Sequence, residues 1–121
     1  MEKHIIFISG SVPSSKNGKI FTGRHLIWSK ASQRYRKESK QQYLDNRELF
    51  LSQIHEYPIK CSIKFIRGTR HKFDLINPTQ TLFDLFVEYQ WIEDDNADII
   101  IPVYEKYEYN KENPGVWITI I

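Results

Sequence analysis

The chain has 121 residues and a mass of 14.5 kDa, and 40% of its residues are hydrophobic and 14% aromatic. This length and composition exclude a disordered chain and predict a single folded domain with its own core. The net charge of +2 conceals two opposed halves: residues 1–72 carry 15 basic and 5 acidic side chains, and residues 73–121 carry 2 basic and 10 acidic ones. No apolar run approaches the ~20 residues that a membrane span needs.

The N-terminal quarter predicts a strand and a hairpin. Residues 3–8 predict a strand, and its apolar run, residues 5–8, is too short for a signal peptide, so we expect a cytoplasmic protein. A polar loop over residues 9–18 follows it. Residues 19–22 and 25–28 can then pair as a hairpin across Gly23.

A long basic helix is predicted next. Ser29 or Ser32 can cap it, and it runs to about Ile54. Its candidate core contacts are apolar or aromatic: Tyr35, Tyr43, Leu44, Phe50, Leu51 and Ile54. Its first turns are crowded with cations: Lys30, Arg34, Arg36, Lys37 and Lys40.

Alternating apolar side chains predict a strand over residues 58–66, with the single cysteine, Cys61, as a buried member. One cysteine excludes a disulfide or a zinc–thiolate site within one chain. A basic connector, residues 67–72, leads to a second helix over residues 78–88. That helix has a wide apolar face formed by Leu82, Phe83, Leu85 and Phe86.

Two further strands are predicted over residues 98–109 and 115–121, joined by a polar turn. Strands combined with two helices indicate the α+β class. We therefore expect one domain over residues 1–121, in which a small mixed sheet packs against the two helices.

Carboxylates gather around the second helix. Asp74 precedes the helix, Asp84 lies within it, and residues 93–96 form an acidic turn after it. Carboxylate oxygens are the ligands that Mg²⁺ prefers. A helix of roughly eleven residues is ~16 Å long, so Asp74 and Asp95 can converge only if the chain folds back after Tyr89 or if Asp74 extends along the helix. The alternative is that Asp74 merely caps the helix and the acidic turn is solvated.

The spacing of these residues has a counterpart in a known family. The residues concerned are Asp74, Asn77, Asp84, Ile92, Asp94 and Asp95. Their intervals resemble the core motif of the RusA-like Holliday-junction resolvases, in which an Asp-x-Asp-Asn segment precedes a helix with an internal Asp and then a Gly-x-Ile-x-Asp-Asp turn. Residues 10–17 and 29–35 also resemble the opening loop and the helix entry of that family, so the resemblance runs from residue 5 to about residue 105.

The resemblance implies a RusA-like resolvase architecture and a function. Such proteins are homodimeric, Mg²⁺-dependent endonucleases, with Mn²⁺ as a possible substitute, that cut four-way DNA junctions in recombination and repair. By position, Asp74, Asp94 and Asp95 would be catalytic, with Asp74 and Asp95 as metal ligands and Asp94 as a ligand or an outer-shell acceptor. Asn77 would orient the loop, and Asp84 would organise the helix or a dimer contact.

Two positions depart from the family pattern. Ile76 stands where the family has its second acid, and Gln80 stands where it has a lysine. These changes remove a ligand and a cation, although Glu93 is a candidate replacement for the carboxylate. The alternative function is therefore a catalytically degenerate relative that binds branched DNA or a partner protein without cleavage.

The basic half supplies candidate phosphate contacts. The DNA-binding residues that we predict are Lys16, Arg34, Lys37, Arg67, Arg70 and Lys72. The cations of the connector, residues 67–72, lead directly into Asp74, so they indicate a phosphate site more strongly than the cations of the long helix do. The alternative is that both groups form a solvated charged face. Candidates for stacking on unpaired bases, or else for the core, are Trp28, Tyr35, Trp91 and Trp117.

The apolar residues of the second helix occupy more than one stripe. This pattern favours burial on two sides, by its own sheet and by a second subunit, and a thickly covered core helix in a monomer is the alternative. No lysine in the glycine-containing loop of residues 10–18 is followed by Ser or Thr, so the sequence does not indicate nucleotide hydrolysis.

Overall fold

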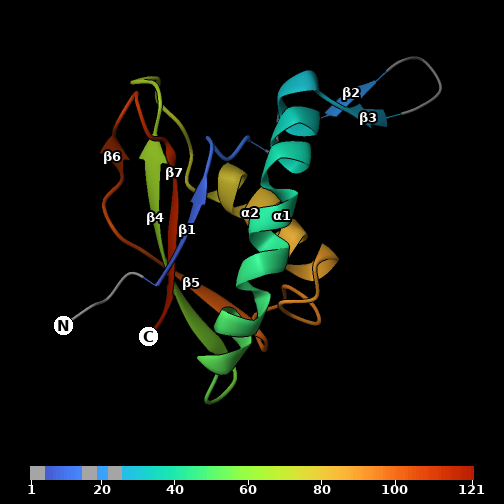
Figure 1. Cartoon of the computed structure of the whole chain (residues 1–121), viewed down its shortest axis with the longest axis vertical. Coiled ribbons are helices and arrows are strands. Elements are labelled where there is room, and N and C mark those ends of the chain that lie inside the picture. The colour runs from blue at the N-terminus through green and yellow to red at the C-terminus, as the bar shows by residue number, and fades with distance from the viewer. Residues whose placement is uncertain (1–4, 15–18, 22–25) are drawn as a thin grey trace.

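The computed structural model of the protein describes residues 5–14, 19–21 and 26–121, and Lys16 lies outside the described residues. A mixed sheet forms one layer of the fold (Figure 1). The strands follow the spatial order β1 (Ile6–Ser9), β7 (Gly115–Ile120), β4 (Ile59–Arg67) and β5 (Ile100–Tyr104), and β6 (Glu108–Tyr109) pairs with β4 beyond β5. The β1–β7 and β7–β4 pairs are antiparallel, whereas β5 and β6 run parallel to β4.

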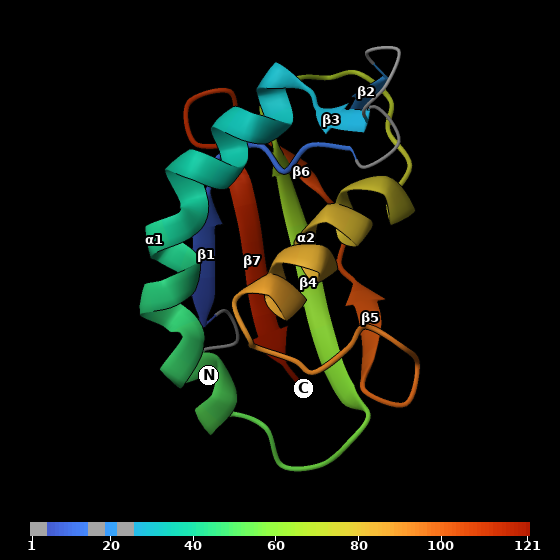
Figure 2. The same ribbon diagram turned by 90° about the vertical axis from the view of Figure 1, so that its right-hand side faces the viewer.

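Both helices, α1 (Lys30–Ser52) and α2 (Ile76–Glu88), cover the same face of the sheet (Figure 2). A separate antiparallel hairpin of β2 (Lys19–Phe21) and β3 (Leu26–Trp28) stands beside the start of α1 (Figure 1). The predicted α+β class, with a small mixed sheet on two helices, is confirmed. In the part of the chain that the structure describes, neither helix combines the length and the apolar character that crossing a bilayer requires.

The start of α1 agrees with the sequence. Ser29 is extended, with φ −62° and ψ 163°, and its Oγ accepts a hydrogen bond from Ser32 N at 3.2 Å. This bond satisfies one of the four N–H groups that a helix start leaves unpaired. The predicted core residue Leu44 is wrong, however, because its side chain lies on the outer side of α1 and is 42% exposed.

An aromatic cluster joins the two helices. Trp91 stacks on Phe86 with ring centroids 4.6 Å apart and contacts Phe50 at 4.7 Å. Its Nε1 donates to the main-chain oxygen of Tyr43 at 2.9 Å, so the buried indole is fully satisfied. Tyr35 is buried in the same layer, with its hydroxyl 2.8 Å from that of Tyr43. Tyr35 and Trp91 are therefore core residues and not platforms for stacking on nucleic acid.

The apolar face of α2 is buried within the chain. Leu82, Leu85 and Phe86 are fully covered, and Phe83 is 6% exposed. The sheet lies on one side of α2, and the aromatic residues of α1 lie on another. One chain thus accounts for the apolar excess of this helix, and the homodimer stays a prediction that draws no support from it.

Several element boundaries differ from the prediction, including those of α2 and of the strand after it. Helix α2 begins at Ile76 and not at Pro78, which the first turn tolerates because its N–H groups have no partner in the helix. The strand predicted over residues 98–109 is divided into β5 and β6. Between them Glu105 N donates to Ile63 O at 2.9 Å, and the Glu105 carboxylate accepts from Ser62 Oγ at 2.9 Å, so the segment stays beside β4 through the interruption.

Candidate nucleic-acid interface and carboxylate site

A cleft of about 950 Å³ opens between the loop after β1 and the start of α2. Gly10, with φ +105°, turns the chain out of β1, and its N–H donates to Pro114 O at 2.9 Å. Residues 11–14 and Ala31 then form one wall, and the connector and the start of α2 form the other. The polar residues that line the second wall and the edge of the sheet include Arg67, His71, Lys72, Asp74, Asn77 and Tyr107.

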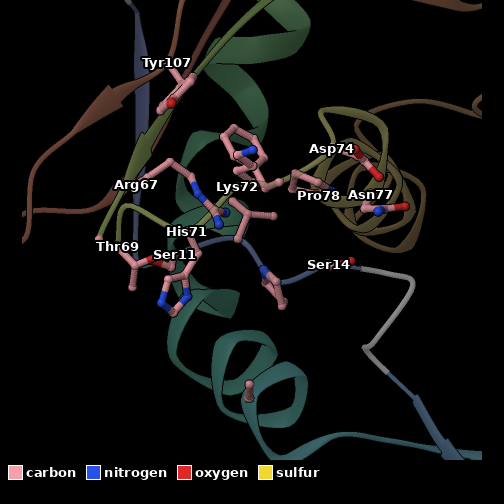
Figure 3. Close-up of a pocket in the computed structure, with 15 residues that line it drawn as sticks. Ser11, Ser14, Arg67, Thr69, His71, Lys72, Asp74, Asn77, Pro78 and Tyr107 are labelled. Carbon is pink, nitrogen blue, oxygen red and sulfur yellow. The ribbon is translucent and has the colours of Figure 1, made fainter.

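Arg67 ends β4 and extends into this group of residues (Figure 3). Its guanidinium carbon lies 4.1 Å from the centre of the Phe73 ring, and Tyr107 meets Phe73 edge-on at 5.0 Å. Arg67 Nε is buried and has no hydrogen-bond partner among the described residues. Burial lowers the pKa of Arg67 and the nearby Tyr107 acts in the opposite direction, but a guanidinium stays charged at neutral pH. The result is a half-buried cation with an unused donor beside the cleft.

The other connector cations surround Arg67. His71 and Lys72 line the cleft with exposed side chains. Arg70 lies outside it, with its guanidinium carbon 3.9 Å from the centre of the Tyr109 ring. The structure thus groups Arg67, Arg70 and Lys72, three of the predicted phosphate contacts, on one edge of the molecule.

Two of the predicted phosphate contacts belong to α1. Arg34 and Lys37 are exposed and lie one turn apart. Arg36 behaves differently, because its Nη1 pairs with Glu88 of α2 at 3.2 Å and its side chain is only 16% exposed. The first turns of α1 therefore divide into cations that face solvent and one that ties the two helices together.

Asp74 lies at the rim of the cleft with an exposed side chain (Figure 3). Its main-chain oxygen accepts from Asn77 N at 3.2 Å, and this turn starts α2. The capping position is occupied by Leu75, without a side-chain hydrogen bond. Asp74 is therefore not a helix cap, and its carboxylate faces the same cleft as Asn77 and the connector cations.

The chain reverses at the end of α2. Gln90 adopts a left-handed conformation with φ 62°, and Trp91 N donates back to Phe86 O at 2.8 Å. The packing of Trp91 on Phe86 completes the arrangement known as a Schellman motif. The acidic turn of residues 93–96 therefore runs back along α2. This is the reversal after Tyr89 that we expected as one of two ways for Asp95 to approach Asp74.

The reversal brings Asp95 to the middle of α2. Gln80 Nε2 donates to Asp84 Oδ1 at 2.9 Å and to Asp95 Oδ2 at 3.3 Å. Asp74 is ten residues before Asp84, about 15 Å along a helix, which is too far for the two to share one ion. Ile76, one turn before Gln80 on the same face, is 73% exposed. The position at which the resembling family has its second acid therefore opens to solvent.

Asp94 is engaged within its own turn. Its Oδ2 accepts from Asn96 Nδ2 at 3.0 Å and its Oδ1 accepts from Asp95 N at 2.9 Å. These bonds, first that from Asn96 and then that from the Asp95 N–H, lower the pKa of Asp94. Asp94 thus stays ionised and shapes the turn that presents Asp95.

We tested whether these donors suit a metal ion. Within the described ranges, no group of three or more His, Cys, Asp or Glu side chains is arranged to hold one. Mg²⁺ at phosphoryl sites is often held by one or two carboxylates, with waters and substrate phosphates completing its shell. The Asp84–Asp95 pair matches that smaller requirement once the Gln80 amide turns its oxygen, rather than its NH₂ group, toward the ion.

Little in the sequence indicated the roles of Asp84, Phe73 and Tyr107 at this site. Asp84 was expected to play only a supporting role, and yet it shares a donor with Asp95. The i, i+4 spacing of Gln80 and Asp84 was the available clue. Phe73 and Tyr107 beside Arg67 had none, since 34 residues separate them in the chain.

No protein-family model matches this chain, and no curated protein matches it either.

Proposed function

We propose that the protein is a Mg²⁺-dependent, structure-selective DNA endonuclease of the RusA-like type that acts on four-way junctions in recombination and repair. The observation that carries the proposal is that Asp74 lines the same cleft as Arg67, His71 and Lys72. Cations that bind a phosphate thus lie beside a carboxylate of the kind that binds a metal. The motif spacing over residues 74–96 adds its support.

In this proposal the basic side chains bind DNA and the acidic side chains bind the metal. Arg34, Lys37 and the connector cations hold the DNA backbone by displacing its counterions, which gives affinity without sequence readout. Asp95 and Asp84 would hold one Mg²⁺ or Mn²⁺ ion at the acidic turn, and Asp74, too far from Asp84 to share that ion, would hold its own at the phosphate in the cleft. The ion, when bound, polarises the phosphate and activates a water. Asp94 keeps the acidic turn in place through its own hydrogen bonds.

The decisive experiment measures cleavage and binding on the same samples. The native protein and Asp95→Asn are incubated with a labelled four-way junction, with and without Mg²⁺ or Mn²⁺. Asn has almost the same shape as Asp, so we expect Asp95→Asn to lose cleavage by a factor of about 100 or more and to keep its binding. If Asp95→Asn cleaves as fast as the native protein, Asp95 is not a ligand and the assignment fails.

A second candidate is a protein that holds branched DNA, or a partner protein, without cutting DNA. It is favoured by Gln80, whose amide bonds both Asp84 and Asp95, and by the exposed Ile76 at the position of a family acid. Junction binding that weakens steeply with salt, and no nicking with either metal, would select this candidate over the endonuclease.

We also propose a homodimer in the cytoplasm. A four-way junction has two equivalent strands, and paired incision needs two sites related by a two-fold axis. The buried free thiol of Cys61 agrees with a reducing compartment. Light scattering at micromolar protein should report twice 14.5 kDa. A mass of one chain at every concentration, with and without junction DNA, contradicts the dimer.

A further inference from the structure

Two arginines of the connector lie over aromatic rings. The guanidinium carbon of Arg67 is 4.1 Å from the Phe73 ring centre, and that of Arg70 is 3.9 Å from the Tyr109 ring centre. A planar guanidinium over a ring is held in place, and little side-chain freedom remains to be lost when a ligand binds. Its opposite face and its N–H donors remain available for a second flat group and for an anion.

Arg67 is the more constrained of the two. Phe73 beneath it is fixed by edge contacts with Phe65 at 6.2 Å and with Tyr107 at 5.0 Å. Its buried Nε lacks a partner within the described part of the chain. A buried donor without a partner is costly to a fold. The other guanidinium N–H groups of Arg67, which lines the cleft, are the donors that a phosphate oxygen would meet.

The size of the cleft limits what can enter. Its volume of about 950 Å³ is bounded by residues 11–14 on one side and by the connector on the other. Pockets of about 300–1,000 Å³ hold small organic ligands. One or two nucleotides fit such a space, whereas a duplex does not, because the whole duplex is wider than its own major groove, which is about 12 Å across.

The lining provides both parts of a nucleotide site. Arg67, His71 and Lys72 supply charge for the phosphate, and the half-buried Pro13 and the exposed Ala31 supply a small apolar surface for a base or a sugar. Without a bound ion, Asp74 before α2 repels phosphates, so the strand is held along the connector side. These groups match every base equally well, which is typical of proteins that bind single strands without sequence preference.

We propose that the cleft binds unpaired nucleotides, as a short single-stranded stretch of DNA at a branch point, with Arg67 bonding a phosphate and presenting its free face to a base. The inference rests on the proposed function, since it takes branched DNA as the partner. It adds that the strands must open locally for the cleft to be filled.

The test uses fluorescence anisotropy with three labelled DNAs: a thymidine strand of about 12 nucleotides, a blunt duplex of matched length and a four-way junction. Arg67→Lys keeps the charge but loses the planar fork, and Arg67→Met keeps the apolar packing on Phe73 without the charge. We expect each to weaken binding of the single strand about tenfold or more and binding of the duplex less than about twofold. Lys37→Ala, on exposed α1, is the matched control and should weaken all three DNAs alike.

Thermal unfolding of each variant establishes that it folds, and Arg67→Lys preserves enough of the side chain to remain testable if Arg67→Met does not fold. Equal loss on single strand and duplex, or no loss on the single strand, overturns the inference. Junction cleavage without single-strand binding keeps the proposed function and removes the inference. Binding of the single strand that depends on Arg67, with no preference for the junction, keeps the inference and removes the branched substrate.

Discussion

Asp84 and Asp95 accept hydrogen bonds from one nitrogen atom, Gln80 Nε2, at 2.9 and 3.3 Å. Asp84 belongs to α2, and Asp95 belongs to the turn that follows it. Two carboxylates that approach each other repel, and a shared amide donor offsets part of that repulsion. The pair therefore defines a position for a positive charge, which a lysine at position 80 or a bound ion would supply.

Gln80→Lys tests that position. An ammonium between the two carboxylates should stabilise the fold by about 0.2–1 kcal/mol, as expected for partly exposed ion pairs, and should lose this gain in high salt. Gln80→Leu is the control, because it removes both hydrogen bonds and adds no charge. Urea unfolding measures both variants. If Gln80→Lys is no more stable than Gln80→Leu at low salt, the two carboxylates do not act as a pair.

Ile76→Asp should add a carboxylate beside Gln80 and Asp84 without disturbing the fold. Ile76 is 73% exposed and opens α2, where a negative charge is favoured by about 0.3–1 kcal/mol. The new carboxylate adds charge to the face of Gln80 and Asp84, so we expect tighter binding of Mn²⁺ in titration calorimetry. Ile76→Asn matches its shape without the charge. Equal Mn²⁺ affinity of the two variants would place the metal site elsewhere.

Gly115→Ala should destabilise the sheet severely. A Cβ at Gly115 would lie 2.6 Å from the main-chain oxygen of Ile8 and would overlap the Phe7 ring. Strand β1 would have to move, at a cost of about 3 kcal/mol, the upper end for overpacking. The control is Gly68→Ala, whose Cβ would have the Ser11 hydroxyl at 3.3 Å and the Pro114 side chain at 3.5 Å as its nearest neighbours. Similar urea midpoints for the two variants would contradict the close approach of β1 and β7.

Stability should fall in alkaline solution. Burial raises the pKa of Cys61 from 9.0 to about 12 and that of Tyr35 from 10.0 to about 12, and the pKa of Tyr43 also rises. At a pH between the ordinary and the raised pKa of each group, the unfolded chain loses a proton that the folded chain retains. The free energy of unfolding therefore decreases as pH rises above about 9.

Urea unfolding between about pH 7 and 11 measures this dependence. Tyr35→Phe removes one of the titrating groups and should flatten the decline above about pH 10. A native profile that stays level up to pH 11 would show that these groups ionise equally well in the folded chain.

Local patterns in the sequence predicted most of the elements. Three features depend only on neighbours within a few positions: the cap at Ser29, the alternation around Cys61 and the apolar face of residues 82–86. Local sequence is therefore sufficient to predict them. The acidic turn and its need for a reversal after Tyr89 were also visible in the sequence. The left-handed residue that makes the reversal, Gln90, was not, because a glycine usually marks such a position.

Tertiary packing decided where the functional side chains meet. Trp91, packed on Phe86 and Phe50, sets the direction of the chain that carries Asp95. That direction brings Asp95 to Gln80 and Asp84, while Asp74 remains at the cleft. The same packing buries the apolar face of α2 within one chain. Contacts of this kind join segments that are far apart in sequence, and their free energy comes from shape and burial, which no local residue pattern records.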